Sequence, residues 1–259
     1  MNATVVELEH VSLTYHEPHA ETLAIDDLCF SIREGEFVAV VGPSGCGKTS
    51  MLSLLAGLMR PSAGEVRIMG NPVIGPDRSV GYMLQRDHLL DWRTIEGNVL
   101  LGLEVKQMLN ENTRARALEL LDTYGLKEFT HHFPRQLSGG MRQKVALIRT
   151  LAFDPDLLLL DEPFSALDYQ TRLRASDEIH GIIKQEHKTA ILVTHDIAEA
   201  ISMADRILIF SARPTKVKRE LTIELHAPGG RNNPIARRNA PEFHGYFDEI
   251  WKELDTDEK

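Results

Sequence analysis

Eight residues, Gly42 to Thr49, read Gly-Pro-Ser-Gly-Cys-Gly-Lys-Thr and fit a phosphate-binding loop at every fixed position. The three glycines allow successive backbone N–H groups to curl around a polyphosphate. Lys48 brings a positive charge toward the β- and γ-phosphates, and the hydroxyl of Thr49 suits Mg²⁺. The apolar run 36–42 predicts a strand before the loop, and a helix from Lys48 to about Met59 directs its positive end at the same anion. The spacing therefore predicts a nucleoside triphosphate site.

Polar side chains also end three other predicted strands. The four leucines 157–160 are followed by Asp161 and Glu162, and shorter strands end at Gln85 and His195. Adjacent residues on a strand face opposite ways, so the two carboxylates are expected to do different jobs. Two solvated acids are the alternative reading. The uncharged strand favours a functional pair, because ligands of open α/β sheets bind at this edge.

A second anion site is indicated at Leu137-Ser-Gly-Gly-Met141. Ser138 is a plausible N-cap for the helix that follows, and Gly139 and Gly140 leave backbone N–H groups uncovered. Tyr15 ends the first predicted strand, where its ring could stack on a nucleotide base. A half-buried strand tyrosine is the alternative, and strand position alone favours it.

The remaining pattern predicts the elements that position these side chains. Residues 4–15 and 23–32 alternate as two strands of an antiparallel hairpin. From Thr94 to about Phe153 apolar residues recur at three- and four-residue intervals, which predicts a helical subdomain inserted in an α/β core. The tail starts with β-type alternation from Thr215, breaks at 227–234, and ends in an amphipathic helix over 241–254.

Composition narrows the class of protein. The chain has 259 residues, 42% of them apolar, and a formal charge of −9, which disfavours non-specific nucleic-acid binding by the whole surface. Its two cysteines are too few and too differently placed for a disulfide framework or a metal cluster, and they suit a reducing cytoplasm. No leader peptide or membrane span is recognisable, so the chain is expected neither to enter nor to cross a membrane by itself. For Arg231, Arg237 and Arg238 in the tail, a solvated loop is favoured over a phosphate or RNA site.

With these residues in view, residues 4–225 resemble the ATP-binding subunits of ABC transporters. The resemblance implies a P-loop NTPase core of the ABC ATPase type, with an N-terminal antiparallel β subdomain and an inserted α-helical subdomain. It implies an ABC ATPase domain over 1–225, with its helical subdomain at about 86–153, and a short C-terminal extension over 226–259.

By that resemblance, each motif acquires a role at the ATP site. Tyr15 is the adenine-stacking aromatic, Gln85 the Q-loop glutamine, Asp168 the D-loop aspartate and His195 the switch histidine. Asp161 and Glu162 form the Walker B pair, with Glu162 catalytic. The residues that contact nucleotide through the Walker A loop and the signature motif are Gly42, Pro43, Ser44, Gly45, Cys46, Gly47, Lys48, Thr49 and Ser50, then Ser138, Gly139 and Gly140.

The implied cofactors are ATP and Mg²⁺, with the metal near Thr49, Gln85 and Asp161. Lys48 and the metal neutralise phosphate charge, while Glu162 polarises the attacking water. His195 contacts the γ-phosphate. The signature helix has no evident use in a monomer that already has a phosphate loop, so it is expected to cap ATP bound by a second copy in a head-to-tail homodimer.

The same resemblance implies separate membrane permease subunits, an importer, and indirectly a solute-binding protein, with this chain at the cytoplasmic face of the inner membrane. Residues 87–98 are similar to a stretch of the nitrate, sulfonate and taurine importer subfamily. Trp92 is then a candidate for contacting a permease coupling helix, or else a core tryptophan of the helical subdomain.

Two alternatives belong to other functional classes. A soluble ABC-type ATPase that remodels ribosomes, DNA or an Fe–S assembly complex usually carries tandem domains, a coiled-coil insertion or a metal-binding segment, and none is recognisable in this sequence. A regulatory module without turnover would have lost Glu162 or His195, and both are present.

Overall fold

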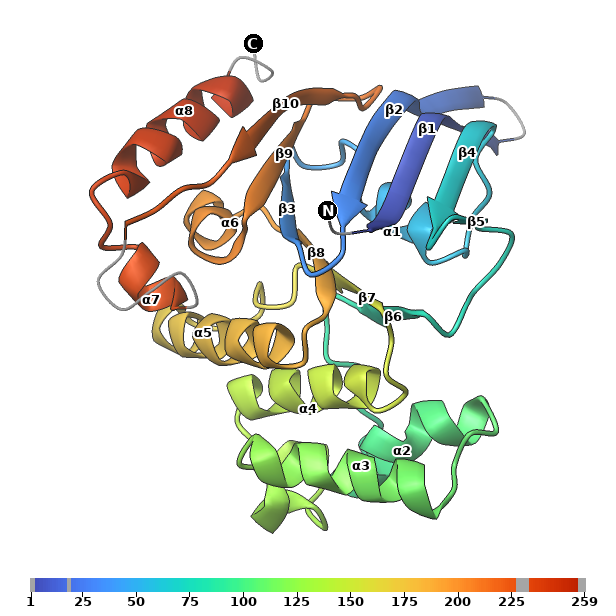
Figure 1. Ribbon diagram of the computed structural model, residues 1–259, viewed down its shortest axis with the longest axis vertical. Coiled ribbons are helices and arrows are strands. Elements are labelled where there is room, and N and C mark those ends of the chain that lie inside the picture. Colours follow the sequence, from blue (N-terminus) through green and yellow to red (C-terminus); the bar gives the residue numbers. More distant parts are fainter. Residues whose placement is uncertain (1–2, 18–19, 227–232, 256–259) are drawn as a thin grey trace.

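The computed structural model describes residues 3–17, 20–226 and 233–255. Its centre is a six-stranded sheet in the order β10-β9-β3-β8-β7-β6 (Figure 1). The strands are β3 (Phe37–Val41), β6 (Val80–Met83), β7 (Leu157–Asp161), β8 (Thr189–Val193), β9 (Arg206–Phe210) and β10 (Val217–Thr222). All neighbours are parallel except β10, which pairs antiparallel with β9 at one edge.

The second sheet is antiparallel, in the order β2-β1-β4-β5. It contains β1 (Thr4–Glu17), β2 (Ala20–Arg33), β4 (Ala63–Ile68) and β5 (Asn71–Pro72), and it lies beside α1 at the upper right of Figure 1. The long β1–β2 hairpin matches the hairpin that the sequence predicts, with several irregularities in its register. Together the two sheets give the predicted α/β core, whose sheet is mainly parallel, with an antiparallel β subdomain.

The central strands are apolar without alternation because both of their faces are buried. On β3, Val38 and Val40 face a core shared with α1 and the antiparallel sheet. Phe37, Ala39 and Val41 face a second core, which the helices on the other side complete. The sheet therefore separates two hydrophobic layers and fixes the ends of its strands between them.

The inserted helices form a separate layer at the bottom of Figure 1. They are α2 (Ile95–Val105), α3 (Glu111–Thr123) and α4 (Gly139–Leu151), with short 3-10 turns at Lys127–Phe129 and Pro134–Gln136. Thr94 caps α2 through the N–H of Gly97, and Asn110 caps α3 in a reciprocal capping box with Thr113. The predicted helical subdomain is present.

The remaining helices cover the core sheet. They are α1 (Lys48–Leu55), α5 (Tyr169–Gln185), α6 (Ile197–Met203), α7 (Pro234–Arg237) and α8 (Phe243–Asp255). In the tail, α8 buries Phe243 and Ile250 in the same core as the central strands. The division between 1–225 and 226–259 stays a prediction. No helix within the described ranges combines the length and apolar character needed to cross a bilayer.

Two sequence expectations are wrong, and one of the two alternatives for Trp92 is excluded. The helix after the loop ends at Leu55 instead of about Met59, because Gly57 takes a left-handed conformation (φ +68°) against the backbone of Gly75. Trp92 is no core residue, since 76% of it is exposed.

The second wrong expectation concerns the basic cluster of the tail, for which a solvated loop is favoured by the sequence. Arg237 is 4% exposed, ends α7 and donates a hydrogen bond to the carbonyl of Ala204 at 2.6 Å. Arg238 follows as the C-cap residue, and Arg231 lies outside the described residues. Sequence pattern could not reveal the buried acceptor that Arg237 meets.

Gly64 provides a test of how tightly the β subdomain is packed. It has φ +78°, and a Cβ there would lie 2.2 Å from the carbonyl oxygen of His10. Gly70 has a similar φ of +75° with nothing within 4 Å of a Cβ. Both Gly→Ala variants face the left-handed cost of about 1–2 kcal/mol. We expect Gly64→Ala to lose about 1–3 kcal/mol more, the cost of overpacking, in urea unfolding. Equal losses would contradict the close packing.

Candidate nucleotide site

The phosphate-binding loop connects β3 to α1. Gly45 and Gly47 have φ values of +72° and +126°, which side chains rarely allow. At Gly42 a Cβ would lie 3.0 Å from Cβ of Phe210, so a side chain would crowd β9. Gly47 is the N-cap of α1 and has no side chain to satisfy the first N–H groups of the helix. The loop and the helix start therefore leave backbone N–H groups available to an anion, and the phosphate-binding role of these residues stays a prediction.

Lys48 is 7% exposed, and its ammonium group lies along the loop. It donates to the carbonyl oxygens of Gly42 at 2.7 Å and Pro43 at 2.9 Å, and it lies 3.9 Å from Sγ of Cys46. Cys46 itself is 2% exposed, so its thiol packs beneath the loop and only its backbone can face a phosphate. A buried positive charge thus lies at the centre of the candidate anion site.

Asp161 ends β7 and is 6% exposed. The Thr49 hydroxyl is 3.5 Å from its Oδ1, and the Tyr82 hydroxyl donates to its Oδ2 at 3.3 Å. Burial raises the pKa of this carboxyl, while the two hydroxyl groups oppose the shift. A buried carboxylate next to a hydroxyl is an oxygen donor set that suits a hard divalent cation.

Glu162 follows Asp161 and faces a different group of side chains. Its Oε2 accepts a hydrogen bond from Nε2 of Gln85 at 3.2 Å and lies 3.2 Å from Nδ1 of His195. Its φ is +44°, and its N–H donates to the carbonyl of Val193 at 2.9 Å. This left-handed turn ends the strand and directs the carboxylate toward the tips of β6 and β8. The predicted division of roles between the two acids therefore has a geometric basis.

Hydrogen bonds to the start of α6 fix the segment that carries His195. The Thr194 hydroxyl donates to Oε2 of Glu199, and Asp196 caps α6 through the N–H of Glu199 at 3.0 Å. Glu199 is 3% exposed, and burial raises its pKa to about 7. Arg172 bonds Asp196 and the carbonyl of Leu167, which precedes Asp168. The His195 segment and the Asp168 turn are thus connected through one guanidinium group.

Ser138, Gly139 and Gly140 form the N-terminal start of α4 in the helical subdomain. Ser138 caps α4 through the N–H of Met141 at 3.4 Å, and it is exposed. A Cβ at Gly139 would lie 2.8 Å from Leu167, so this helix start packs beside the Asp168 turn. Asp168 caps α5 through Thr171, whose hydrogen bond lowers the pKa of Asp168. The structure brings the signature segment and Asp168 together. Within the described residues, no hydrogen bond or ion pair joins either of them to the phosphate loop.

Tyr15 is half-buried on β1. Its hydroxyl is 2.9 Å from Oγ of Ser50, in the first turn of α1, and 3.6 Å from Sδ of Met59. The ring therefore lies beside the start of the helix that follows the loop. This position is compatible with both sequence readings, and the stacking role stays a prediction.

Comparisons with known proteins decide the family. A family model described as ABC transporter matches residues 25–165. An uncharacterized ABC transporter ATP-binding protein, YtlC, of Bacillus subtilis is 47% identical over 256 residues, covering 98% of this chain and 97% of that protein. The chain belongs to the ABC transporter family. It binds ATP and is an ABC-type ATPase.

Other relatives agree with this assignment. The taurine import ATP-binding protein TauB of Yersinia pestis is 43% identical over 221 residues, which are 85% of this chain and 87% of that protein. A solved dimeric structure of the ATP-binding cassette MJ0796, described as a post-hydrolysis state bound to ADP and Pi, matches with a TM-score of 0.72 and 33% identity. It covers 85% of this chain and 99% of the other.

In this ABC ATPase, sequence reasoning missed three side chains that support the site. Tyr82 holds Asp161, as described above. Arg213 donates to the carbonyl of Gly45 at 2.8 Å, and the buried Thr215 donates to that of Cys46. A tyrosine three residues before Gln85 could have signalled a hydroxyl needing a buried partner. Nothing local marks Arg213 and Thr215, because they follow the loop by about 170 positions.

Glu199 should make the stability of the cassette depend on pH. Its pKa rises from 4.5 to about 7 on folding, so between these values the folded protein keeps a proton that the unfolded chain releases. Stability therefore falls as pH rises through this window. The variant Glu199→Gln lacks this pH-dependent contribution. We therefore expect the free energy of unfolding of Glu199→Gln, minus that of the wild type, to increase from pH 5 to pH 8. A difference that does not change with pH would contradict the assignment.

Proposed function

We propose that this subunit hydrolyses ATP to energise import of a small solute through a separate membrane permease. The solute is a nitrate-, sulfonate- or taurine-like anion or a related compound. The observation that carries the ATPase chemistry is the convergence of Gln85 and His195 on the carboxylate of Glu162. Similarity to TauB, which is named for taurine import, supports the transport role.

The chemistry follows from the positions of the side chains. Mg²⁺ would be held by Thr49 and Asp161, with Gln85 nearby, and would neutralise charge on the β- and γ-phosphates. The buried carboxyl of Asp161, whose pKa is raised, fits this role because a cation compensates the cost of ionising it. Lys48 binds the phosphates from the loop. Glu162 orients and polarises the attacking water, and His195 contacts the γ-phosphate.

A second copy of the chain would complete the site. Ser138 and the two glycines after it expose a helix start away from the phosphate loop of their own chain, as described above. In a head-to-tail dimer the same surface would face the ATP of the other copy. The dimeric MJ0796 structure with ADP and Pi supports this arrangement.

A groove between the ATPase core and the helical subdomain would receive the permease at the cytoplasmic face of the inner membrane. It has a volume of about 570 Å³ and is lined by Leu58, Arg78, Tyr82, Lys106 and Phe153, among others. Tyr82 therefore lines the groove and also holds Asp161. A segment seated in the groove would contact a residue bonded to the candidate Mg²⁺ ligand, which offers a short route for coupling. A solute-binding protein would act through the permease.

The role of Glu162 is tested by comparison with Lys48. Glu162→Gln keeps the size of the side chain and removes its charge, so we expect ATP binding within about twofold of wild type and turnover lowered by at least about 10²-fold. Lys48→Ala should weaken ATP binding itself. Fluorescent-nucleotide titration and phosphate release separate the two effects. Glu128→Gln, on an exposed turn of the helical subdomain, serves as the control. Normal turnover in Glu162→Gln would show that another group activates the water.

The transport role is tested by an affinity pull-down from the cell's own membranes with mass spectrometry. We expect a multi-span permease with the wild type, and less of it with Trp92→Ala. Trp251→Ala is the matched control, because that tryptophan is also exposed (58%) but lies on α8. Both variants should keep basal ATPase activity. Equal loss in the two variants would remove Trp92 from the interface.

The same pull-down tests the alternative class. Recovery of ribosomal or nucleic-acid machinery in place of a permease would favour a soluble remodelling ATPase. The ATP-site chemistry would be unchanged by that result.

A further inference from the structure

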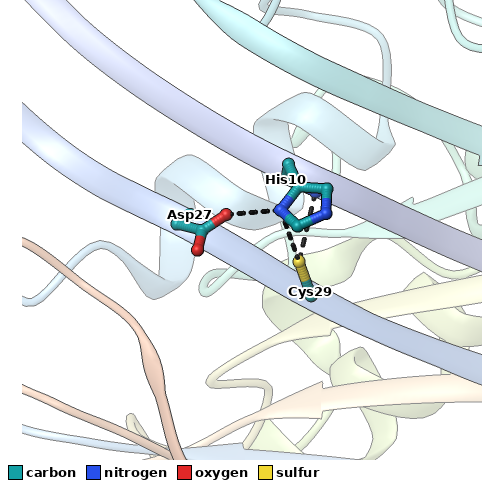
Figure 2. Close-up of side chains that lie close together, drawn as sticks. All are labelled: His10, Asp27 and Cys29. Carbon is teal, nitrogen blue, oxygen red and sulfur yellow. Dashed lines mark hydrogen bonds and ion pairs between the residues drawn. The ribbon is translucent and has the colours of Figure 1, made fainter.

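Three side chains of different chemistry meet on the exposed surface of the β1–β2 hairpin. Figure 2 shows His10 of β1 pointing toward Asp27 and Cys29 of β2. Nδ1 of His10 is 2.7 Å from Oδ1 of Asp27 and 3.7 Å from Sγ of Cys29. One ligand atom from each residue lies within 4.8 Å of the other two. An imidazole nitrogen, a carboxylate oxygen and a thiol sulfur therefore lie close together on this surface.

Two complementary bulges produce this meeting. From Leu8 to Val11 the strand β1 advances three residues while β2 moves two, from Phe30 to Leu28. From Val11 to Leu13 the strand β1 advances two residues, while β2 moves three, from Leu28 to Ile25. The bulge residues His10 and Asp27 take left-handed conformations, with φ of +51° and +55°. Asp27 and Cys29 share the outward face by ordinary alternation along β2, and the bulge in β1 turns His10 to that face, although alternation from the buried Leu8 would point it inward.

The backbone around the cluster is fixed by its neighbours. The N–H of His10 donates to Sγ of Cys29 at 3.2 Å, and the N–H of Asp27 donates to the hydroxyl of Ser12 at 3.1 Å. On the other side of β1, Gly64 of β4 fits against the carbonyl of His10 with no room for a side chain. The donor atoms are therefore mounted on paired strands rather than on a loop, which is how precise sites are built.

The geometry argues against a cysteine nucleophile of the Cys–His–Asp type. In such a relay the imidazole contacts the thiol with one nitrogen and the carboxylate with the other. Here both partners approach the same nitrogen, Nδ1. Three different ligand atoms within 4.8 Å of one another have instead the spacing of ligands around a metal ion.

We propose that His10, Asp27 and Cys29 form a surface site for a zinc-class divalent ion. Nitrogen and oxygen ligands of a tetrahedral Zn²⁺ lie about 3.4 Å apart, given bonds of about 2.0–2.2 Å. Since His10 and Asp27 have side chains 81% and 57% exposed, a small rotation opens the present 2.7 Å to that separation. The ion takes the sulfur as thiolate and the thiol proton passes to solvent. Water fills the fourth position.

The donor set separates this site from the nucleotide site. Thiolate and imidazole suit zinc-class metals, whereas Mg²⁺ prefers oxygen ligands. Mg²⁺ at the concentrations used with ATP should therefore not compete. The expectation from the sequence that two cysteines are too few for a metal cluster considers the cysteines alone. It does not weigh His10 and Asp27 beside Cys29, because His10 and Cys29 are 19 positions apart in the chain.

The test uses Co²⁺ as a spectroscopic substitute for Zn²⁺, with the full chain in nucleotide-free buffer. We expect one Co²⁺ per chain, with near-ultraviolet absorption from thiolate-to-cobalt charge transfer that Zn²⁺ abolishes and Mg²⁺ does not. Cys29→Ser should lose this band. His10→Ala and Asp27→Asn should weaken Co²⁺ binding by at least about tenfold, since loss of even an outer-shell partner costs that much.

His16→Ala is the matched control, because His16 pairs with Glu21 on the same hairpin at 3.1 Å without a cysteine. It should bind Co²⁺ like the wild type. In a second measurement, Zn²⁺ should slow alkylation of the exposed Cys29, with the buried Cys46 as internal reference in the mass spectrum. Wild-type affinity in both His10→Ala and Asp27→Asn would reduce the site to a lone surface thiol and overturn the proposal. So would a band that persists in Cys29→Ser.

Discussion

The parallel register of the core sheet is the constraint on which the rest of this structure depends. β7 pairs with β8 so that Asp161 lies opposite Val193, and the next N–H, that of Glu162, bonds the carbonyl of the same valine. β3 ends beside β8 in the same direction. The loop before α1 and the tips of β6, β7 and β8 therefore meet at one edge. Burial of both faces of these strands makes that register costly to shift.

This edge concentrates buried charge, and the structure compensates each group differently. The ammonium of Lys48 is solvated by loop carbonyls, while Asp161 is bonded by two hydroxyl groups. Glu199 is neutralised by protonation up to about pH 7. Buried charged groups are tolerated at binding sites, because they are held in position before a charged ligand arrives. The site is thus organised by desolvation as much as by direct contacts.

The β subdomain positions its side chains in a different way. In the β1–β2 hairpin, register shifts and positive-φ residues turn exposed side chains toward one another. The segment after β9 connects the two regions, because Thr215 bonds the loop at Cys46 and its backbone bonds Ala24 and Asp26 of β2. The phosphate loop is therefore supported from the hairpin side as well as from the core.

The sequence by itself determined the loop, the strand-end carboxylates, the inserted helices and the family, because these depend on local spacing and on apolar periodicity. It also predicted that the start of the signature helix, now α4, does not serve the phosphate loop of its own chain. The tertiary structure alone decided which distant groups meet: Gln85 and His195 at Glu162, Tyr82 at Asp161, and Arg237 at a buried carbonyl. It also excluded a core position for Trp92, which the sequence had left open, and brought together the side chains of His10, Asp27 and Cys29 on the hairpin. The physical reason is that strand register, bulges and burial arise from pairing between segments far apart in the chain, and no local pattern encodes that pairing.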